Sequence, residues 1–108
     1  MSLYDILQIL NKLAQKPMQK LTVEDLYKVL QEWDANLKKQ ISLFACGGTA
    51  ITIYGHKEST KDVDLLIPSL EEYELLVKTL KKLGYVRKTA DSYGLPGNLW
   101  RFDLFRGN

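Results

Sequence analysis

The residues best suited to chemistry lie in one short stretch, where a glycine pair precedes two closely spaced aspartates. Gly47 and Gly48 stand directly before Thr49, and Asp62 and Asp64 follow thirteen and fifteen positions after that threonine. Side chains alternate along a strand, so Asp62 and Asp64 are expected to project from the same face. Two adjacent carboxylates repel each other, and burying both is costly unless a cation neutralises them. The pair therefore indicates a site for a hard divalent cation such as Mg²⁺, which prefers oxygen ligands.

A third carboxylate, Asp103, interrupts a stretch that otherwise has the pattern of an aromatic strand. The apolar side chains of this stretch share one face, whereas Arg101 and Asp103 share the other. An acid at that place indicates a third metal ligand. The alternative is a surface acid that pairs with Arg101 or Arg106.

The glycine pair complements the three acids. Gly47 and Gly48 separate a short apolar run from a predicted helix that begins near Thr49. Glycines at such a turn let the backbone approach a ligand closely, and the helix N-terminus offers free N–H groups to an anion. Thr49 adds a hydroxyl, and a plain N-cap is the alternative role for it. A phosphate-binding turn beside three carboxylates is typical of metal-assisted phosphoryl or nucleotidyl transfer.

These motifs resemble the signature of the nucleotidyltransferase superfamily, which has the polymerase-beta-like fold. The resemblance rests on Gly47-Gly48-Thr49-Ala50, Gly55 and Ser59-Thr60-Lys61-Asp62-Val63-Asp64, and it covers about residues 41–105. It is strongest to minimal nucleotidyltransferases, a group that includes toxins of bacterial and archaeal toxin–antitoxin systems.

The resemblance implies a role for each matching residue. Asp62 and Asp64 would bind the metal ions, Mg²⁺ or Mn²⁺, and Asp103 would join one metal and help to activate the incoming hydroxyl. The implied reaction is attack of that hydroxyl on the α-phosphate of a nucleoside triphosphate, with release of pyrophosphate. The residues implied to hold the nucleotide are Gly47, Gly48, Thr49, Ser59 and Thr60.

Two lysines are further candidates for contact with the phosphates. An arginine often seen in this part of the family is absent, and Lys57 and Lys61 are the cations available in its place. Ordinary solvated lysines are the alternative. The only histidine, His56, is interpreted as a solvated loop residue, and Cys46 as a small buried apolar residue.

Two predicted helices precede this core. The first begins at Ser2 and ends before Pro17, and the second begins at Thr22 and continues to about Leu37. We expect them to form an N-terminal helical hairpin, residues 1–40, that covers one side of the core.

The core itself is predicted to alternate strands and helices in a single domain of residues 1–108. The pattern indicates an α+β fold, α/β-like in its element order, with helices flanking a small mixed sheet. The predicted elements are a strand at 43–46, a helix at 49–54, a strand at 63–67, a helix from a Ser69–Glu72 capping box to Gly84, and strands at 85–89 and 99–105 joined by a hairpin loop at 91–97.

Composition excludes several classes of protein. Of 108 residues, 45% are hydrophobic and 26% charged, which is typical of a globular domain rather than a disordered chain. Fifteen basic and 13 acidic residues give a net charge of +2, too small to indicate nucleic-acid binding by bulk charge. A single cysteine excludes an intrachain disulfide framework. Interrupted apolar runs predict no membrane span, and Asp5 disfavours a signal peptide, so a cytoplasmic protein is expected.

The sequence thus predicts a Mg²⁺-dependent nucleotidyltransferase whose acceptor is a hydroxyl on a protein, an RNA or a small molecule. The alternative is a catalytically silent module of the same fold that binds a nucleotide or a partner protein, since the predicted helices precede the core instead of following the third acid. A third hypothesis is that the helical hairpin binds nucleic acid or forms a homodimer. The near-balanced charge disfavours nucleic acid, whereas the wide apolar stripe of the first helix allows a dimer interface.

Overall fold

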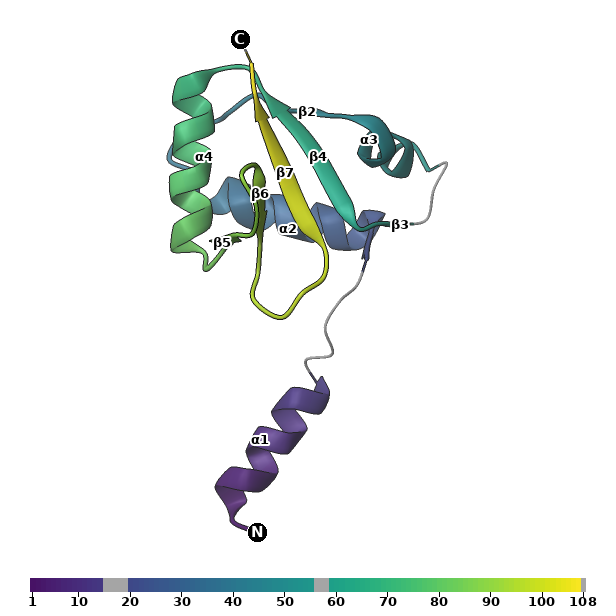
Figure 1. Cartoon of the computed structure of the whole chain (residues 1–108), viewed down its shortest axis with the longest axis vertical. Helices are drawn as coiled ribbons and strands as arrows, with labels where there is room; N and C mark the ends of the chain where they lie inside the picture. Colours follow the sequence, from purple (N-terminus) through teal and green to yellow (C-terminus); the bar gives the residue numbers. More distant parts are fainter. Residues whose placement is uncertain (15–19, 56–58, 108) are drawn as a thin grey trace.

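The computed structural model combines helices with a twisted, mixed β-sheet (Figure 1). It describes residues 1–14, 20–55 and 59–107, and for residues 11–14 the backbone alone. The predicted α+β class is confirmed, and no helix in the described part of the chain is long and apolar enough to cross a membrane. The helices in those ranges are α1 (Leu3–Ala14), α2 (Val23–Asn36), α3 (Gly47–Ile53) and α4 (Leu70–Lys82).

The main sheet is built around two long parallel strands, β4 and β7. Its shorter strands all run antiparallel to their neighbours, as do β1 and β3, which pair separately. The predicted small mixed sheet is therefore confirmed. In spatial order the main sheet consists of β2 (Phe44–Ala45), β4 (Asp62–Ile67), β7 (Arg101–Arg106), β6 (Ser92–Gly94) and β5 (Val86–Arg87). The separate pair consists of β1 (Leu21–Thr22) and β3 (Ser59–Thr60).

The hydrophobic core lies on one face of β4 and β7. Val63, Leu65 and Phe102 alternate along these strands with the acidic residues and are almost completely buried. In Figure 1, α2 passes behind the sheet and α4 stands along its left side. The Trp33 ring of α2 lies 4.4 Å from the Phe102 ring, centroid to centroid, and its Nε1 donates to the Tyr85 hydroxyl at 3.3 Å. The opposite face carries the acids and Arg101 at one end of the two strands, and Leu66 and Phe105 toward the other.

Capping residues fix where two of the helices begin. At the start of α2, the Asp25 amide donates to Thr22 Oγ1 at 3.2 Å, and the Thr22 amide donates to the Asp25 carboxylate at the same distance. At the start of α4, the Glu72 amide donates to Ser69 Oγ, also at 3.2 Å. The capping box predicted there is only half formed, because the Glu72 carboxylate accepts instead from the Ser42 amide, at 2.6 Å. This bond ties α4 to the segment that leads into β2.

One segment predicted as a loop contains a strand. The stretch 91–97 includes β6, which lies between β5 and β7 in the sheet. Ser92 and Tyr93 are buried and pair in register with Asp103 and Phe102 of β7. Asp91 belongs to the bend between β5 and β6, and a second turn follows β6, where Gly97 has a φ of +88°. A loop prediction from turn-forming residues was therefore wrong for the first part of this segment.

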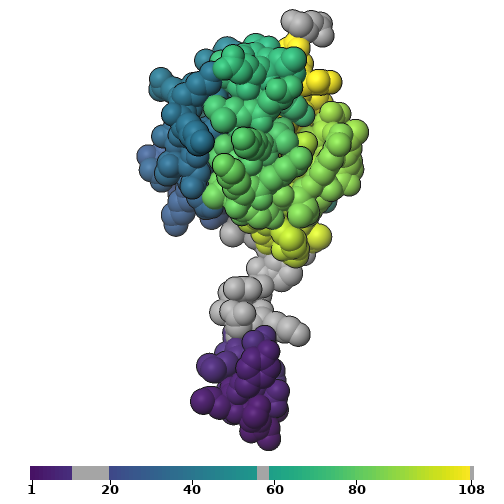
Figure 2. All heavy atoms as spheres, turned by 90° about the vertical axis from the view of Figure 1, so that its left-hand side faces the viewer, coloured from purple at the N-terminus to yellow at the C-terminus, as the bar shows by residue number. Residues whose placement is uncertain are grey.

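Both predicted N-terminal helices are present, but they do not pack against each other. Helix α1 extends beyond the rest of the molecule, and the side chains of residues 1–10 are exposed (Figures 1 and 2). The apolar stripe that predicted a hairpin is a property of the helix alone and does not specify which surface it contacts. The prediction that Pro17 ends the first helix lies outside the described residues, and the single-domain assignment stays a prediction.

A matched pair of phenylalanine truncations in the sheet tests this account of the core. Phe102 is completely buried in β7, whereas Phe44 in β2 is 57% exposed. We expect Phe102→Ala to lower the free energy of unfolding by about 3–5 kcal/mol, because it leaves a cavity at the centre of the aromatic cluster. Phe44→Ala should cost less than about 1 kcal/mol. Urea unfolding followed by circular dichroism measures both, and equal losses would contradict the assignment.

Candidate metal and nucleotide site

The three predicted acids lie on the face of β4 and β7 opposite the core. Asp64 and Asp103 are register partners across the parallel pair, and Asp62 lies two residues before Asp64 on the same side of its strand. The side chain of Asp103 is 19% exposed and that of Asp62 is 51% exposed. The strand geometry therefore brings Asp64 and Asp103 side by side and leaves Asp62 at the outer end of the group.

The negative charge of this group is only partly compensated. Partial burial raises the pKa of Asp64 above its usual value, and hydrogen bonding and charge repulsion from Asp103 raise it further. The charge of Asp62 acts on Asp64 in the same direction. Each of these effects disfavours the ionised form of Asp64. A cation bound between Asp64 and Asp103 would instead favour the ionised form of both carboxyls.

An arginine lies among the acids. Arg101 Nε is 3.2 Å from Asp62 Oδ1 and 4.0 Å from Asp103 Oδ1, and its side chain is 41% exposed. The sequence left open that Asp103 pairs with Arg101 or Arg106. In the structure Arg101 does lie near Asp103, but it lies closer to Asp62. Arg106, the other arginine in that alternative, has its guanidinium 5.7 Å from the ring centre of Tyr73. Arg101 thus compensates part of the negative charge of the three acids.

A serine holds Asp103 in place. Ser92 Oγ donates a hydrogen bond to Asp103 Oδ1 across the β6–β7 pair, and the Ser92 side chain is almost completely buried. Thr89 Oγ1 donates to Ser92 Oγ at 2.7 Å, so two hydroxyls act in series. Sequence reasoning missed Ser92 because its segment was predicted as a loop. The strand that contains Ser92 is only three residues long, Ser92–Gly94, and so short a run gives no clear strand signal in the sequence.

The first turn of α3 continues the edge of β4 where β2 ends. The Cys46 amide donates to the Asp64 carbonyl at 2.9 Å, and the Asp64 amide donates to Thr49 Oγ1 at 2.8 Å. Gly47 has a φ of +52°, and a Cβ atom there would lie 3.9 Å from Asp64 Oδ2. The predicted strand–glycine–helix arrangement is confirmed, with the helix already starting at Gly47. The glycine turn and the acids are therefore neighbours.

Two threonines predicted to contact nucleotide have structural partners instead. Thr49 is completely buried, with its hydroxyl accepting from the Asp64 amide. Thr60 is 3% exposed, and its hydroxyl donates to the Asp62 carbonyl at 2.8 Å. Burial of both side chains means that their hydroxyls hold the backbone of β4 in place and do not face a ligand in this structure.

The other predicted nucleotide-binding residues have different surroundings. Gly48 is half-buried in the first turn of α3, and Ser59 is half-buried in β3. Lys61 is exposed directly before the first acid, so it is open to contact with a phosphate. Lys57 and His56 lie outside the described residues.

The acids fit a divalent cation only in part. Across residues 1–14, 20–55 and 59–107, no group of three or more His, Cys, Asp or Glu side chains is arranged to hold a metal ion. The Asp62 carboxylate is paired with Arg101. Asp64 and Asp103 nevertheless fit Mg²⁺, because this ion is usually held by one or two carboxylates together with water and phosphate oxygens.

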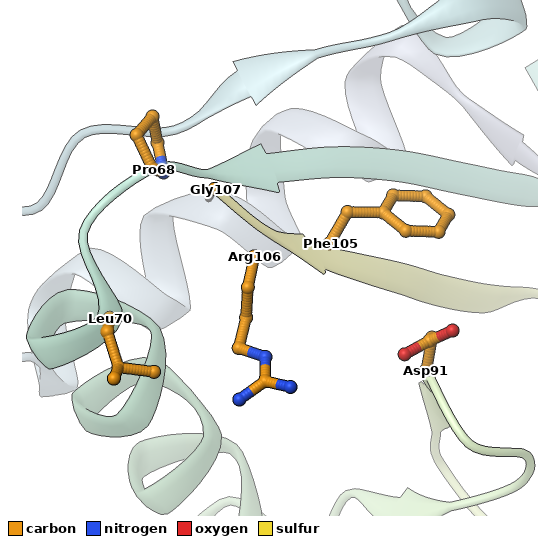
Figure 3. Close-up of a pocket in the computed structure, with 6 residues that line it drawn as sticks. All are labelled: Pro68, Leu70, Asp91, Phe105, Arg106 and Gly107. Atoms are coloured by element: carbon orange, nitrogen blue, oxygen red, sulfur yellow. The ribbon is translucent and has the colours of Figure 1, made fainter.

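A cavity of about 560 Å³ lies at the other end of β4 and β7. It opens between the start of α4 and the segment before β6, and the Arg106 side chain extends into it (Figure 3). None of the residues that line it was predicted as a site residue. The lining consists of Pro68, Leu70, Asp91, Phe105, Arg106 and Gly107.

Comparisons of the chain with protein-family models, with curated proteins and with solved structures found no significant match. The interpretation of the site therefore rests on its geometry and on the sequence motifs.

The serine behind Asp103 gives a first test of the site geometry. Ser92→Ala removes a buried donor to a carboxylate, so we expect it to lower the free energy of unfolding by about 1–3 kcal/mol. Thr89→Ala removes only the second hydroxyl of the series and should cost less. Urea unfolding of the two variants measures both losses of stability. Equal losses, or a larger loss for Thr89→Ala, would contradict the hydrogen-bond series Thr89–Ser92–Asp103.

The raised pKa of Asp64 gives a second test, through the pH dependence of stability. Its pKa in the folded protein lies above the ordinary 3.8, so the contribution of this carboxyl to stability is fully present below pH 3.8 and is lost as the pH rises through the folded pKa. Asp64→Asn should therefore stabilise the metal-free protein at pH 7, by less than about 1 kcal/mol after solvent screening. The gain should disappear in acid, where Asp64 is protonated in the folded and unfolded states alike.

The matched control for this variant is Asp62→Asn. Arg101 neutralises Asp62, so removing that carboxylate should give no gain at pH 7. Thermal unfolding in chelator at several pH values measures both variants. A stabilising Asp62→Asn together with a neutral Asp64→Asn would contradict the charge distribution described here.

Proposed function

We propose that the protein is a cytoplasmic, Mg²⁺-dependent nucleotidyltransferase with a polymerase-beta-like fold. It would transfer a nucleoside monophosphate from a nucleoside triphosphate to a hydroxyl on a protein, an RNA or a small molecule. A role as the toxin of a toxin–antitoxin pair follows from the same resemblance.

The observation that carries the proposal is the side-by-side placement of Asp64 and Asp103 next to the glycine turn. Asp64 and Asp103 are in register across a parallel strand pair, and partial burial together with Asp103 raises the pKa of Asp64, so ionising it without a cation is unfavourable. A structural role does not explain such a pair, because apolar or neutral side chains at these positions would avoid the repulsion. A cation-binding role does explain it, and the exposed Gly47 leaves room for a phosphate beside the acids.

Each residue of the site has a part in the proposed reaction. Asp64 and Asp103 would hold the cation, and the hydrogen bond from Ser92 would keep Asp103 in orientation. The bound Mg²⁺ would neutralise the phosphates and make the α-phosphorus easier to attack. The acceptor oxygen forms a bond to that phosphorus, the bond to the β-phosphate oxygen breaks, and pyrophosphate leaves. The hydroxyl proton passes to a carboxylate, for which Asp103 is placed.

Among the basic residues that the structure describes, Arg101 lies nearest to the acids and would be the one to contact the substrate phosphates. Its guanidinium lies beside Asp62 and close to Asp103, and it is partly exposed. A guanidinium can donate two parallel hydrogen bonds to a phosphate, which a lysine cannot. We propose that Arg101 takes the place of the family arginine absent from the sequence, with Lys61 adding charge at the edge of the site.

A silent nucleotide-binding module is the second candidate function. The observation in its favour is the Arg101–Asp62 ion pair, which neutralises one of the three acids and leaves two for the metal. Such a site would bind a metal–triphosphate complex and not assemble the geometry for transfer. Binding without turnover would distinguish this function from the enzyme.

The test uses the full chain with Mg²⁺ or Mn²⁺ and each of the four α-labelled nucleoside triphosphates. Binding is measured by calorimetry, and transfer by label retained on protein, RNA or small-molecule acceptors. We expect Asp64→Asn and Asp103→Asn to lower the rate of transfer by about 100-fold or more, because each removes a ligand to the charge-neutralising cation. Asp91→Asn, an acid outside the group, should leave transfer unchanged.

The outcomes separate the two candidate functions. Transfer that depends on Asp64 and Asp103 supports the enzyme, and binding that depends on them without transfer supports the silent module. Absence of metal-dependent binding to every triphosphate, in protein whose circular dichroism is that of a folded chain, would overturn both.

A further inference from the structure

Helix α1 presents an apolar surface that the rest of its own chain does not cover. Its start is fixed by a hydrogen bond from the Asp5 amide to Ser2 Oγ at 3.1 Å. Leu3, Leu7 and Leu10 are 56–72% exposed, and Ile6 is 41% exposed. These residues follow the spacing i, i+3, i+4, i+7, which is the pattern by which an amphipathic helix enters a groove. A helix of this length is marginal in water unless its apolar face is packed.

The body of the molecule carries an apolar groove that is not filled by α1. A cavity of about 170 Å³ lies between α2 and α3. Leu26 forms its buried floor, while Tyr27 and Ile53 at its rim are 63% and 45% exposed. Val23 and Leu30 complete the lining, so every residue there is apolar or aromatic. We call the surface of these five residues the α2–α3 groove.

We propose that the chain forms a homodimer in which α1 of each copy docks in the α2–α3 groove of the other. Each copy then provides one apolar helix and one apolar groove, and the two contacts are identical by two-fold symmetry. An exchange of this kind closes after two copies and does not grow into a filament.

The shape of the chain favours a second copy as the occupant. Helix α1 extends away from the body in both views (Figures 1 and 2). The radius of gyration is 15.7 Å and the longest dimension is 56 Å. A compact domain of this length has a radius of gyration of about 13 Å, so the described chain is more extended than a domain that has buried all its helices. A helix held away from its own body is positioned to reach the body of a partner.

The oligomeric state of the full chain, measured by size-exclusion chromatography with light scattering over a concentration series, tests this proposal. We expect a mass of twice the monomer's 12.4 kDa at high concentration. Leu7→Glu should shift the chain to monomer because it places a charge on the apolar face of α1. Tyr27→Glu should do the same because it places a charge at the rim of the groove.

Two neighbouring substitutions serve as matched controls. Gln8→Glu and Lys28→Glu alter exposed positions next to these residues but outside the apolar face and the groove lining, and both should remain dimeric. Circular dichroism confirms that each variant is folded. A wild type that is monomeric at every concentration overturns the proposal. The proposal is also overturned if Leu7→Glu disrupts the dimer and Tyr27→Glu does not, because α1 would then contact a surface other than the α2–α3 groove.

Discussion

The parallel pairing of β4 with β7 is the constraint on which the rest of the structure depends. Its register sets Val63 beside Phe102 on one face and Asp64 beside Asp103 on the other. The apolar face is filled by Trp33 and its aromatic neighbours, and this packing fixes the two strands relative to each other. A shift of the register by one residue would turn acids toward the core. The packing that stabilises the fold therefore also holds two carboxylates together against their repulsion.

The surroundings of the acids reduce this repulsion in different ways. Ser92 donates a hydrogen bond to Asp103, whereas Arg101 pairs with Asp62 through charge. Asp64 is partly buried and lies against Asp103, another acid, and both effects raise its pKa. The uncompensated charge is thus concentrated at the acid nearest Gly47. In the function we propose, that is the place where a divalent cation has most to contribute.

The fold could be predicted from the sequence where a local signal was strong. The alternation at Val63–Leu65, the glycine turn at Gly47 and the N-cap at Thr22 each correspond to what the structure contains. Prediction failed where the outcome depends on a distant partner. Ser92 belongs to a strand only because β7 pairs with it, and Glu72 leaves its capping box because the Ser42 amide competes for it. The same holds at the site. The strand alternation predicted that the three acids share a face with Arg101, but not that Arg101 would lie closer to Asp62 than to Asp103, or that the Thr49 and Thr60 hydroxyls bond to the backbone.

The two strands at the edges of the main sheet are each only two residues long. β2 and β5 therefore offer very few backbone groups to an incoming strand, and α3 takes over the edge of β4 where β2 stops. Exposed sheet edges are a common route to uncontrolled aggregation, and short edges suppress it. The short edges consequently disfavour pairing of two copies through their sheets, and in the dimer we propose the copies would recognise each other through helices instead.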